Sequence, residues 1–320
     1  MGRVRHPRRG SMQFWPRKRS RHSIARIRSW TNESKVKILG FIGYKAGMTH
    51  LMAVDNRPKS ITKGERISIP STIIECPPMT VAGVVFYQKH GTGVRKSTSI
   101  LAPKLPKELG NTFPLPKKAV KSFDAVKEFE DLRLLVFSNP KSANTGSKVP
   151  KVLEMALGGS KDDKLAYAKE ILGKEIKVED VFEKGNPTDI HGITKGKGFQ
   201  GTVKRYGVPI RQHKAEKTKR GIGNLGSWTP KRVDYRVAQG GKMGFHSRTE
   251  YNKQILKVGQ NGEDVNPQSG IPHYGLVNNS YLLIRGSVVG PVKRPIVLTQ
   301  ATRIKKKTLK EAPEIKLISK

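Results

Sequence analysis

The feature that most constrains this chain is a basic stretch near its middle, between His191 and Lys257. It holds sixteen Lys or Arg against three acids, a net charge of +13. From Arg211 onward it shows no sustained apolar period of 2 or 3.6 residues, although it carries scattered aromatic residues. Such a stretch cannot bury a core of its own, so a partner of opposite charge must order it.

Glycines and cations alternate where this stretch begins. The glycines permit positive φ or close backbone approach, and the cations between them suit a surface covered in phosphates, for which folded RNA is the natural candidate. The residues are Gly192, Gly196, Gly198 and Gly201 with Lys195, Lys197, Lys204 and Arg205. A glycine-rich turn at the end of a strand explains the same pattern without a ligand, so this alternative stays open.

The whole chain repeats the charge imbalance. Its 320 residues include 62 Lys or Arg against 25 Asp or Glu, a formal net charge of +37. A charge of this size predicts a polyanionic partner, either nucleic acid or an anionic membrane surface. No apolar run approaches 18 residues, and none follows the basic N-terminal segment, so neither a membrane span nor a signal peptide is expected. We therefore expect no membrane partner, which leaves nucleic acid.

Catalytic patterns are weak. The position five before Gly196 is His191, so the glycine spacing of a phosphate-binding P-loop is not met. The eight histidines lack metal-ligand spacing, and the single Cys76 excludes an internal disulfide or a cysteine-rich zinc site. The sequence predicts no enzyme, cofactor, metal or small-molecule substrate, and it places Cys76 in the core.

Two clusters of short β-branched runs predict strands. They cover residues 37–42, 65–69, 71–76 and 80–87, and then 254–258, 281–289 and 295–298. Neither cluster is large enough alone, so we expect a mostly β fold in which both form one antiparallel β-barrel.

The segment between the clusters differs in charge. Residues 108–183 contain thirteen acids and thirteen bases, which predicts an α+β insertion facing solvent or protein. Residues 133–137 are typical of a strand. Helical spacing appears twice, at Ala119, Val120, Phe123, Val126 and Phe129, and at Leu165, Ala168, Ile171 and Leu172.

Charge and pattern together predict seven segments. The N-terminal arm has ten Lys or Arg and no acid within its first thirty residues, so alone it is expected to be disordered. The segments are a basic N-terminal arm (1–35), the first half of the barrel (36–100), the α/β insertion (101–181), a barrel segment with the glycine-rich loop (182–205), a basic central extension (206–250), the second half of the barrel (251–302) and a basic C-terminal tail (303–320).

Several motifs carry a family resemblance. They are Phe182, Asp189, Gly192, Thr194, Gly196, Lys197, Gly198, Gly201 and Arg205, together with the segments 6–11, 16–20, 40–50 and 244–249. The chain resembles, from about residue 3 to 297, the universal third protein of the large ribosomal subunit, in its archaeal and eukaryotic branch. The resemblance implies a translation-protein-like β-barrel body with a helical insertion and long basic RNA-binding extensions, located in the cytoplasm.

The resemblance also implies a function. The expected role is a structural one in the large ribosomal subunit, with direct binding of large-subunit rRNA near its 3′ end and a part in early subunit assembly. Neighbouring large-subunit proteins are the other expected partners. The central extension would reach toward the peptidyl transferase centre, where aminoacyl-tRNA enters, with Trp228 near its tip packing on rRNA. Burial of Trp228 under its own loop is the alternative.

The residues expected to contact RNA are mainly cations of the arm, the loop and the extension. They are Arg3, Arg5, Arg8, Arg9, Arg17, Lys18, Arg19, Arg21, Lys195, Lys197, Lys204, Arg205, Arg211, His213, Lys214, Lys217, Lys219, Arg220, Trp228, Lys231, Arg232, Arg236, His246 and Arg248, with close backbone approach at Gly192, Gly196, Gly198 and Gly201. A structural role stays open for both histidines. Eukaryotic relatives carry a methylated histidine where this chain has Lys219, so that modification is not expected here.

Two other functions fit the sequence less well. A chromosomal or regulatory DNA-binding protein would carry similar charge, but no helix-turn-helix or basic-zipper pattern is visible. Irregular extensions suit irregular RNA surfaces better than a uniform duplex. An RNA-modifying enzyme would need a cofactor site or catalytic constellation, and none stands out.

Overall fold

The computed structural model describes residues 8–116, 122–126, 128–214, 218–305 and 311–320, and the chain divides into two compact units. The smaller unit combines the chain up to His22 with Ile193–Ser247. The larger unit combines Ser23–Gly192 with Arg248–Lys320. Residues in strands far outnumber residues in helices, so the prediction of a mostly β protein is confirmed.

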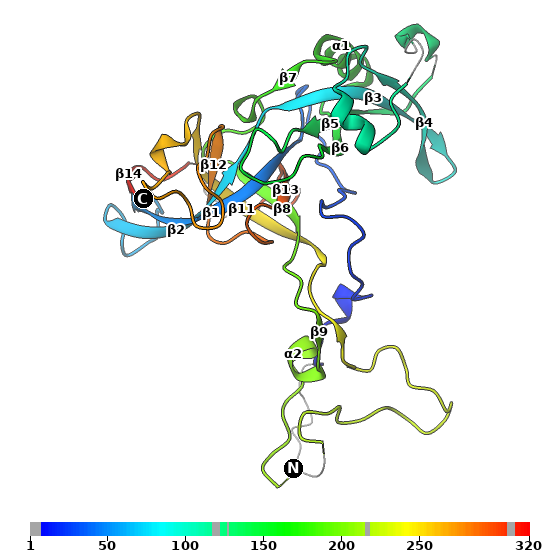
Figure 1. Cartoon of the computed structure of the whole chain (residues 1–320), viewed down its shortest axis with the longest axis vertical. Coiled ribbons are helices and arrows are strands. Elements are labelled where there is room, and N and C mark those ends of the chain that lie inside the picture. The colour runs from blue at the N-terminus through cyan, green and yellow to red at the C-terminus, as the bar shows by residue number, and fades with distance from the viewer. Residues whose placement is uncertain (1–7, 117–121, 127, 215–217, 306–310) are drawn as a thin grey trace. The chain divides into compact units, whose positions relative to one another are not determined.

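Seven strands form the main sheet (Figure 1). They are β1 (Gly40–Val54), β2 (Arg66–Glu75), β8 (Pro187–Ile193), β11 (Ser247–Gly259), β12 (Tyr281–Arg285), β13 (Pro295–Gln300) and β14 (Ile315–Ile318). Their order is β13-β8-β11-β12-β2-β1-β14, and β13 also pairs with β1. The hydrogen-bonded pairing therefore returns from β1 to β13, where it began.

A second sheet, of five strands, lies in the larger unit. It has the order β4-β3-β5-β6, with β7 paired to β3. The strands are β3 (Met79–His90), β4 (Gly93–Leu101), β5 (Asp131–Ser138), β6 (Lys151–Ala156) and β7 (Glu175–Ile176). Strand β3 is central, since it pairs with β4, β5 and β7 in antiparallel register.

The strands of the main sheet are apolar on both faces. Ile73 and Leu283 belong to one core cluster, whereas their chain neighbours Ile74 and Leu282 belong to another. Successive side chains of a strand point to opposite faces, so both faces are covered. The larger cluster also takes in residues of the five-stranded sheet. Cys76 is buried in it, as predicted, and burial raises the pKa of its thiol.

Each expected strand overlaps an observed one, but the expected strands 65–69 and 71–76 form the single strand β2. The expected barrel strand 80–87 is instead part of β3, in the five-stranded sheet, because it pairs with β4, β5 and β7.

One of the two expected helices forms. Helix α1 (Lys161–Ile171) begins at Ser160, whose hydroxyl accepts a bond from the Asp163 amide. Its first turn carries two acids and its last turn Lys169, in accord with the helix dipole. The spacing at Leu165 and Ala168 therefore predicted it correctly.

The prediction of a second helix around Phe123 is wrong for the residues that the structure describes. Only a single 3-10 turn, η3 (Phe123–Ala125), forms there, while Ala119 and Val120 lie outside the described residues. Phe123 and Phe129 pack edge-on against Phe86 of β3, at centroid distances of 6.4 and 5.3 Å. Their spacing thus serves attachment of an irregular segment to the sheet.

Short helical turns complete the larger unit: η2 (Lys107–Asn111), η4 (Val178–Asp180) and η5 (Gly262–Asp264). The smaller unit contains η1 (Met12–Phe14), β9 (Phe199–Gln200), α2 (Thr202–Tyr206) and β10 (Gly241–Lys242). The described residues between Gly207 and Gly240 form neither helix nor strand, as their lack of period predicted. No helix in the described part of the chain is both long and apolar enough to cross a membrane.

Candidate nucleic-acid interface

The N-terminal arm packs on the base of the extension within the smaller unit. The Trp15 ring stacks on Tyr206 at a centroid distance of 6.2 Å and meets Tyr235 edge-on at 5.8 Å. The guanidinium of Arg17 lies 4.3 Å from the Tyr206 ring centroid and donates to the Arg205 carbonyl at 3.2 Å. Aromatic and cation–π contacts therefore fix the arm to α2.

Arg205 holds together the two limbs of the extension, which are the segment from the glycine-rich loop through α2 and the returning segment that contains β10. Its Nε donates to the Lys242 carbonyl at 3.1 Å, and its Nη1 donates to the carbonyls of Gln239 (3.0 Å) and Gly240 (3.4 Å). Helix α2 ends directly after it at Gly207, whose φ of +70° suits a helix C-terminus. Much of the donor capacity expected to bind phosphate is thus used on backbone carbonyls.

His246 has a structural environment. The side chain is buried, and its Nδ1 lies 2.9 Å from the Lys18 carbonyl, to which it donates. The His246 amide donates to the Thr194 hydroxyl at 3.1 Å, and Ser20 donates its amide to the Phe245 carbonyl at 2.8 Å. These bonds favour a structural role for His246, because its ring connects the N-terminal arm to the segment that follows β10.

The glycine-rich loop leaves its backbone accessible at three of the four glycines. A Cβ would meet no described atom within 4 Å at Gly198 or Gly201, and only an ordinary contact at Gly196. Gly198 also has a φ of +64°, which favours glycine. At Gly192 a Cβ would lie 2.6 Å from a Val289 methyl, so that glycine serves packing.

Six cations converge on one groove of the smaller unit. The groove has a volume of about 560 Å³, and none of the described residues that line it is acidic. Its lining consists of Arg17, Lys18, Arg19, Ser20, Arg21, Arg205 and Lys242. Like charges gathered this closely concentrate anions at the surface, so the groove suits a chain of phosphates.

Most of the predicted cations are exposed. The exposed side chains are those of Arg8, Arg9, Lys18, Arg19, Arg21, Lys195, Lys197, Lys204, Arg211, His213, Lys214, Lys219, Arg220, Lys231, Arg232 and Arg236. Arg17, Arg205 and Arg248 are half-buried, and Arg3, Arg5 and Lys217 lie outside the described residues.

Some exposed cations also have partners inside the protein. Arg236 makes a bidentate pair with Asp234, with nitrogen–oxygen distances of 2.8 and 3.0 Å, and this lowers the pKa of the carboxyl to about 2. Arg8 donates to the Arg236 carbonyl at 2.5 Å. Arg211 donates to the Ile222 carbonyl at 3.0 Å. The charge of Arg236 is therefore largely compensated.

Trp228 is exposed to 84%, so its burial beneath its own loop is ruled out. The turn around it is shaped by local bonds, because the Gly226 amide donates to Asn224 Oδ1 at 2.7 Å and Ser227 Oγ donates to the Thr229 carbonyl at 2.6 Å. Leu225 is also exposed. The loop therefore presents a large aromatic surface that the described residues do not cover.

Sequence reasoning missed Trp15, Tyr206 and Lys242. The first two form the aromatic base of the extension, and Lys242 lines the cationic groove. An aromatic residue inside a basic segment was the available signal. The distance along the chain between Trp15 and Tyr206 gave no sign that they meet.

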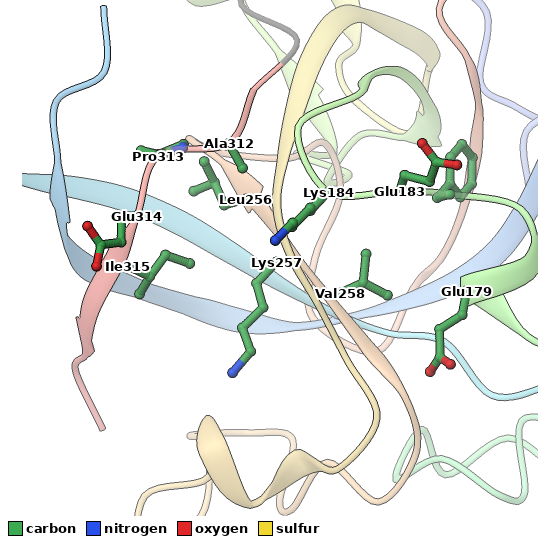
Figure 2. Close-up of a pocket in the computed structure, with 11 residues that line it drawn as sticks. Glu179, Glu183, Lys184, Leu256, Lys257, Val258, Ala312, Pro313, Glu314 and Ile315 are labelled. Atoms are coloured by element: carbon green, nitrogen blue, oxygen red, sulfur yellow. The ribbon is translucent and has the colours of Figure 1, made fainter.

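Another groove, in the larger unit, has mixed charge (Figure 2). It has a volume of about 930 Å³ and lies beside β11 and the start of β14. Glu179, Glu183 and Glu314 line it together with Lys184 and Lys257, and apolar residues fill the remainder. Among the described residues, no group of three His, Cys, Asp or Glu could hold a metal ion.

These features define a basic, mostly β protein with a cation-lined groove. The model of the family described as Ribosomal protein L3 matches residues 1–320. The chain belongs to this family. The resemblance seen in the motifs is thus confirmed, and the protein is a structural ribosomal component with a role in translation, not an enzyme.

Curated archaeal relatives agree along nearly the whole chain. A protein of Methanocaldococcus jannaschii is 44% identical over 325 residues, covering 99% of this chain and 97% of its own. One from Methanococcus vannielii is 45% identical, covering 98% and 96%. One from Methanothermobacter thermautotrophicus is 44% identical, covering 100% and 98%. Each of the three is named large ribosomal subunit protein uL3.

Proposed function

We propose that this protein is a constituent of the large ribosomal subunit that binds rRNA directly near the 3′ end of the molecule. The observation that carries the proposal is the groove lined by six cations and no described acid. Lysine and arginine bind phosphates irrespective of base, and each contact releases counterions. Membership of a large-subunit protein family supports rRNA over duplex DNA as the phosphate-bearing partner.

The exposed cations and the residues behind them have different roles in this proposal. Lys195, Lys197 and Lys204 contact phosphates where the glycine-rich backbone comes close. Arg205 and His246 position the limbs and the arm, since their ring and guanidinium donors are used within the protein. Trp228 packs on rRNA near the peptidyl transferase centre, where aminoacyl-tRNA enters, and helps to set its conformation.

The body supports the extensions in the same proposal. The pairing that returns from β1 to β13 supports an antiparallel barrel of the translation-protein type. The charge-neutral insertion (101–181) faces solvent or neighbouring large-subunit proteins, and the arm, extension and tail reach into RNA. Early assembly of the subunit in the cytoplasm follows, because extensions that thread between RNA helices must be placed before those helices close.

Sedimentation of a tagged chain tests the proposal. In an archaeal host where it replaces the resident copy, we expect the chain to sediment with large subunits, to resist a high-salt wash and to occur in early precursor particles. Recovery with small subunits, or at the top of the gradient, would contradict it. Release of the chain by DNase from a chromosomal fraction would favour the DNA-binding rival.

A further inference from the structure

A second basic groove lies within the larger unit, and none of its residues was expected to bind RNA. It has a volume of about 1000 Å³ and is formed by the loop 57–62 between β1 and β2, by residues 252–254 of β11 and by Arg285 of β12. Its cations are Arg57, Lys59, Lys253 and Arg285, and no described lining residue is acidic.

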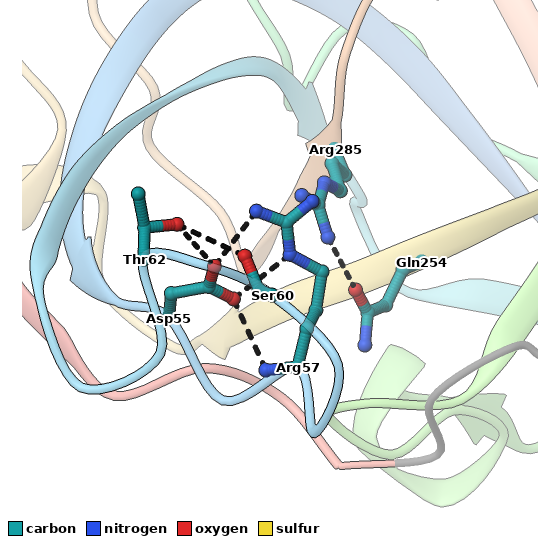
Figure 3. Close-up of polar contacts among 6 residues, drawn as sticks. All are labelled: Asp55, Arg57, Ser60, Thr62, Gln254 and Arg285. Carbon is teal, nitrogen blue, oxygen red and sulfur yellow. Dashed lines mark hydrogen bonds and ion pairs between the residues drawn. The ribbon is translucent and has the colours of Figure 1, made fainter.

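The buried Asp55 holds one of these cations, Arg57, in place through hydrogen bonds (Figure 3). Its side chain is 1% exposed, whereas that of Arg57 is 46% exposed. Asp55 accepts bonds from Arg57 Nε (2.8 Å), Arg57 Nη2 (2.7 Å) and the Thr62 hydroxyl (2.8 Å). The bonds from Arg57 hold the pKa of the Asp55 carboxyl well below its usual value, so the pair stays charged.

The Arg57 guanidinium is therefore preorganised. Two of its nitrogens are used on Asp55, and no described residue accepts a bond from its Nη1. A planar group already held in place loses little conformational entropy when a ligand binds. The buried carboxylate thus acts as a support for a surface site.

Two other cations of the groove carry charge that no acidic side chain compensates. Arg285 donates to Gln254 Oε1 at 3.4 Å, and Lys59 is exposed; within the described residues neither has an acidic partner. Lys253 is paired with Glu250 at 3.4 Å. The groove therefore presents a net positive charge of two at Lys59 and Arg285.

The remaining lining is apolar or neutral. Pro58 and the fully exposed Ile61 supply apolar surface, and the hydroxyls of Ser60 and Thr62, which bond each other, are neutral. Apolar contact, a fixed guanidinium plane and free cations together match a nucleotide, which combines a flat base with a charged phosphate. The volume lies at the upper end of the range of small-ligand sites.

We propose that this groove binds one unpaired rRNA nucleotide. Its phosphate lies on Lys59 and Arg285, and its base packs against Arg57 and Ile61. The inference rests on the proposed function, since it takes rRNA as the partner. Acidic protein segments would satisfy the cations but would leave the flat guanidinium and the apolar wall without a matching surface.

Charge substitution tests the phosphate-binding role of Lys59 and Arg285, the two cations without an acidic partner among the described residues. The full-length K59Q/R285Q variant is compared with K104Q/R95Q, which removes the same charges from exposed residues outside the groove. Binding to large-subunit rRNA is measured across a salt series. We expect the log–log salt slope of the groove variant to become shallower by about 0.7 to 0.9 for each phosphate that it no longer neutralises, and that of the control to match wild type.

The outcomes distinguish failure of the groove proposal from failure of the proposed rRNA-binding function. Equal slopes for the groove variant and the control, with wild-type binding intact, would overturn the groove and leave the proposed function standing. Absence of wild-type binding to rRNA would overturn both.

Crosslinking identifies the occupant. A photoreactive benzophenone amino acid is placed at Ile61 of the full chain, and the assembled large subunit is irradiated. We expect crosslinks to rRNA that fall at least severalfold when K59Q/R285Q is added, with unchanged thermal unfolding. Crosslinks to a ribosomal protein in place of rRNA would overturn the assignment of a nucleotide.

Discussion

At the scale of single residues, Trp228 and His191 show opposite relations between burial and role. Trp228 lies exposed in a turn formed by local bonds, so its ring adds little to the packing of the fold and is accessible to a partner. His191 is half-buried between two hydroxyls, Thr249 Oγ1 at 3.0 Å and Thr299 Oγ1 at 3.1 Å. Its ring is part of the folded body.

The first prediction concerns Trp228→Ala. We expect the free energy of unfolding to change by less than about 0.5 kcal/mol, because the substituted side chain packs on little of the protein. Ribosomes carrying it should show impaired aminoacyl-tRNA accommodation and altered sensitivity to antibiotics of the peptidyl transferase centre. Leu225→Ala, in the same exposed turn, serves as the control. Normal accommodation and normal sensitivity with Trp228→Ala would refute the stacking role.

The second prediction concerns pH. Burial lowers the pKa of His191 below its ordinary 6.5, while the charge of Asp189 acts in the opposite direction. Just below pH 6.5 the unfolded chain therefore binds a proton that the folded ring does not. The contribution of His191 to stability is complete above that pH and is lost as the pH falls.

The measurement compares unfolding free energies at about pH 7.5 and about pH 5.5. The loss of stability on acidification should be smaller in His191→Asn than in wild type, because the variant has no ring to protonate in the unfolded state. The exposed His90→Asn variant should match wild type. An unchanged pH dependence in His191→Asn would show that the ring makes no such contribution.

At the scale of elements, the junction between α2 and β10 decides how the extension is held. Arg205 bonds three carbonyls near β10, and the neighbouring limbs exchange two backbone bonds: the Met243 amide to Gly198 at 2.8 Å and the Lys197 amide to Met243 at 2.9 Å. The glycine-rich loop is one of those limbs. Its geometry therefore depends on Arg205.

Arg205→Lys tests this dependence. A lysine keeps the charge but cannot reach three carbonyls with a planar fork. We expect amide hydrogen exchange at Lys197 and Met243 to accelerate roughly fivefold, for a loss of about 1 kcal/mol in local stability. Lys204→Arg, an exposed neighbour, is the control. Unchanged exchange at both amides in Arg205→Lys would contradict the role of Arg205 as a positioning residue.

The same scale shows what a sequence can predict. Runs of β-branched residues identified strands where pattern and burial coincide, as at Ile73 and Ile74 of β2, but β4, β6, β8 and β14 were not expected. Helical spacing succeeded at α1, where Ser160 caps the helix, and failed at Phe123 and Phe129, where tertiary contact with Phe86 fixed the spacing. Local pattern cannot distinguish these two causes.

At the scale of the whole molecule, charge predicted the class of partner, and motifs predicted the family. Lys195 and Lys197 are exposed, as an RNA-contacting role requires. The packing of Trp15 on Tyr206 could not be predicted, since it joins segments far apart in the chain. The use of Arg205 on backbone carbonyls was hidden for the same reason, because donors look alike in a sequence whatever they bind.

The most direct test of the central claim is binding of the full chain to large-subunit rRNA fragments and to duplex DNA across a salt series. A general polyanion binder loses affinity for both polymers, with a slope of roughly −0.7 to −0.9 per phosphate contact. We predict that preference for one 3′-region rRNA fragment persists at high salt, because shape and stacking add to charge. Equal affinity for rRNA and DNA at every salt concentration, with no preferred fragment, would contradict the account.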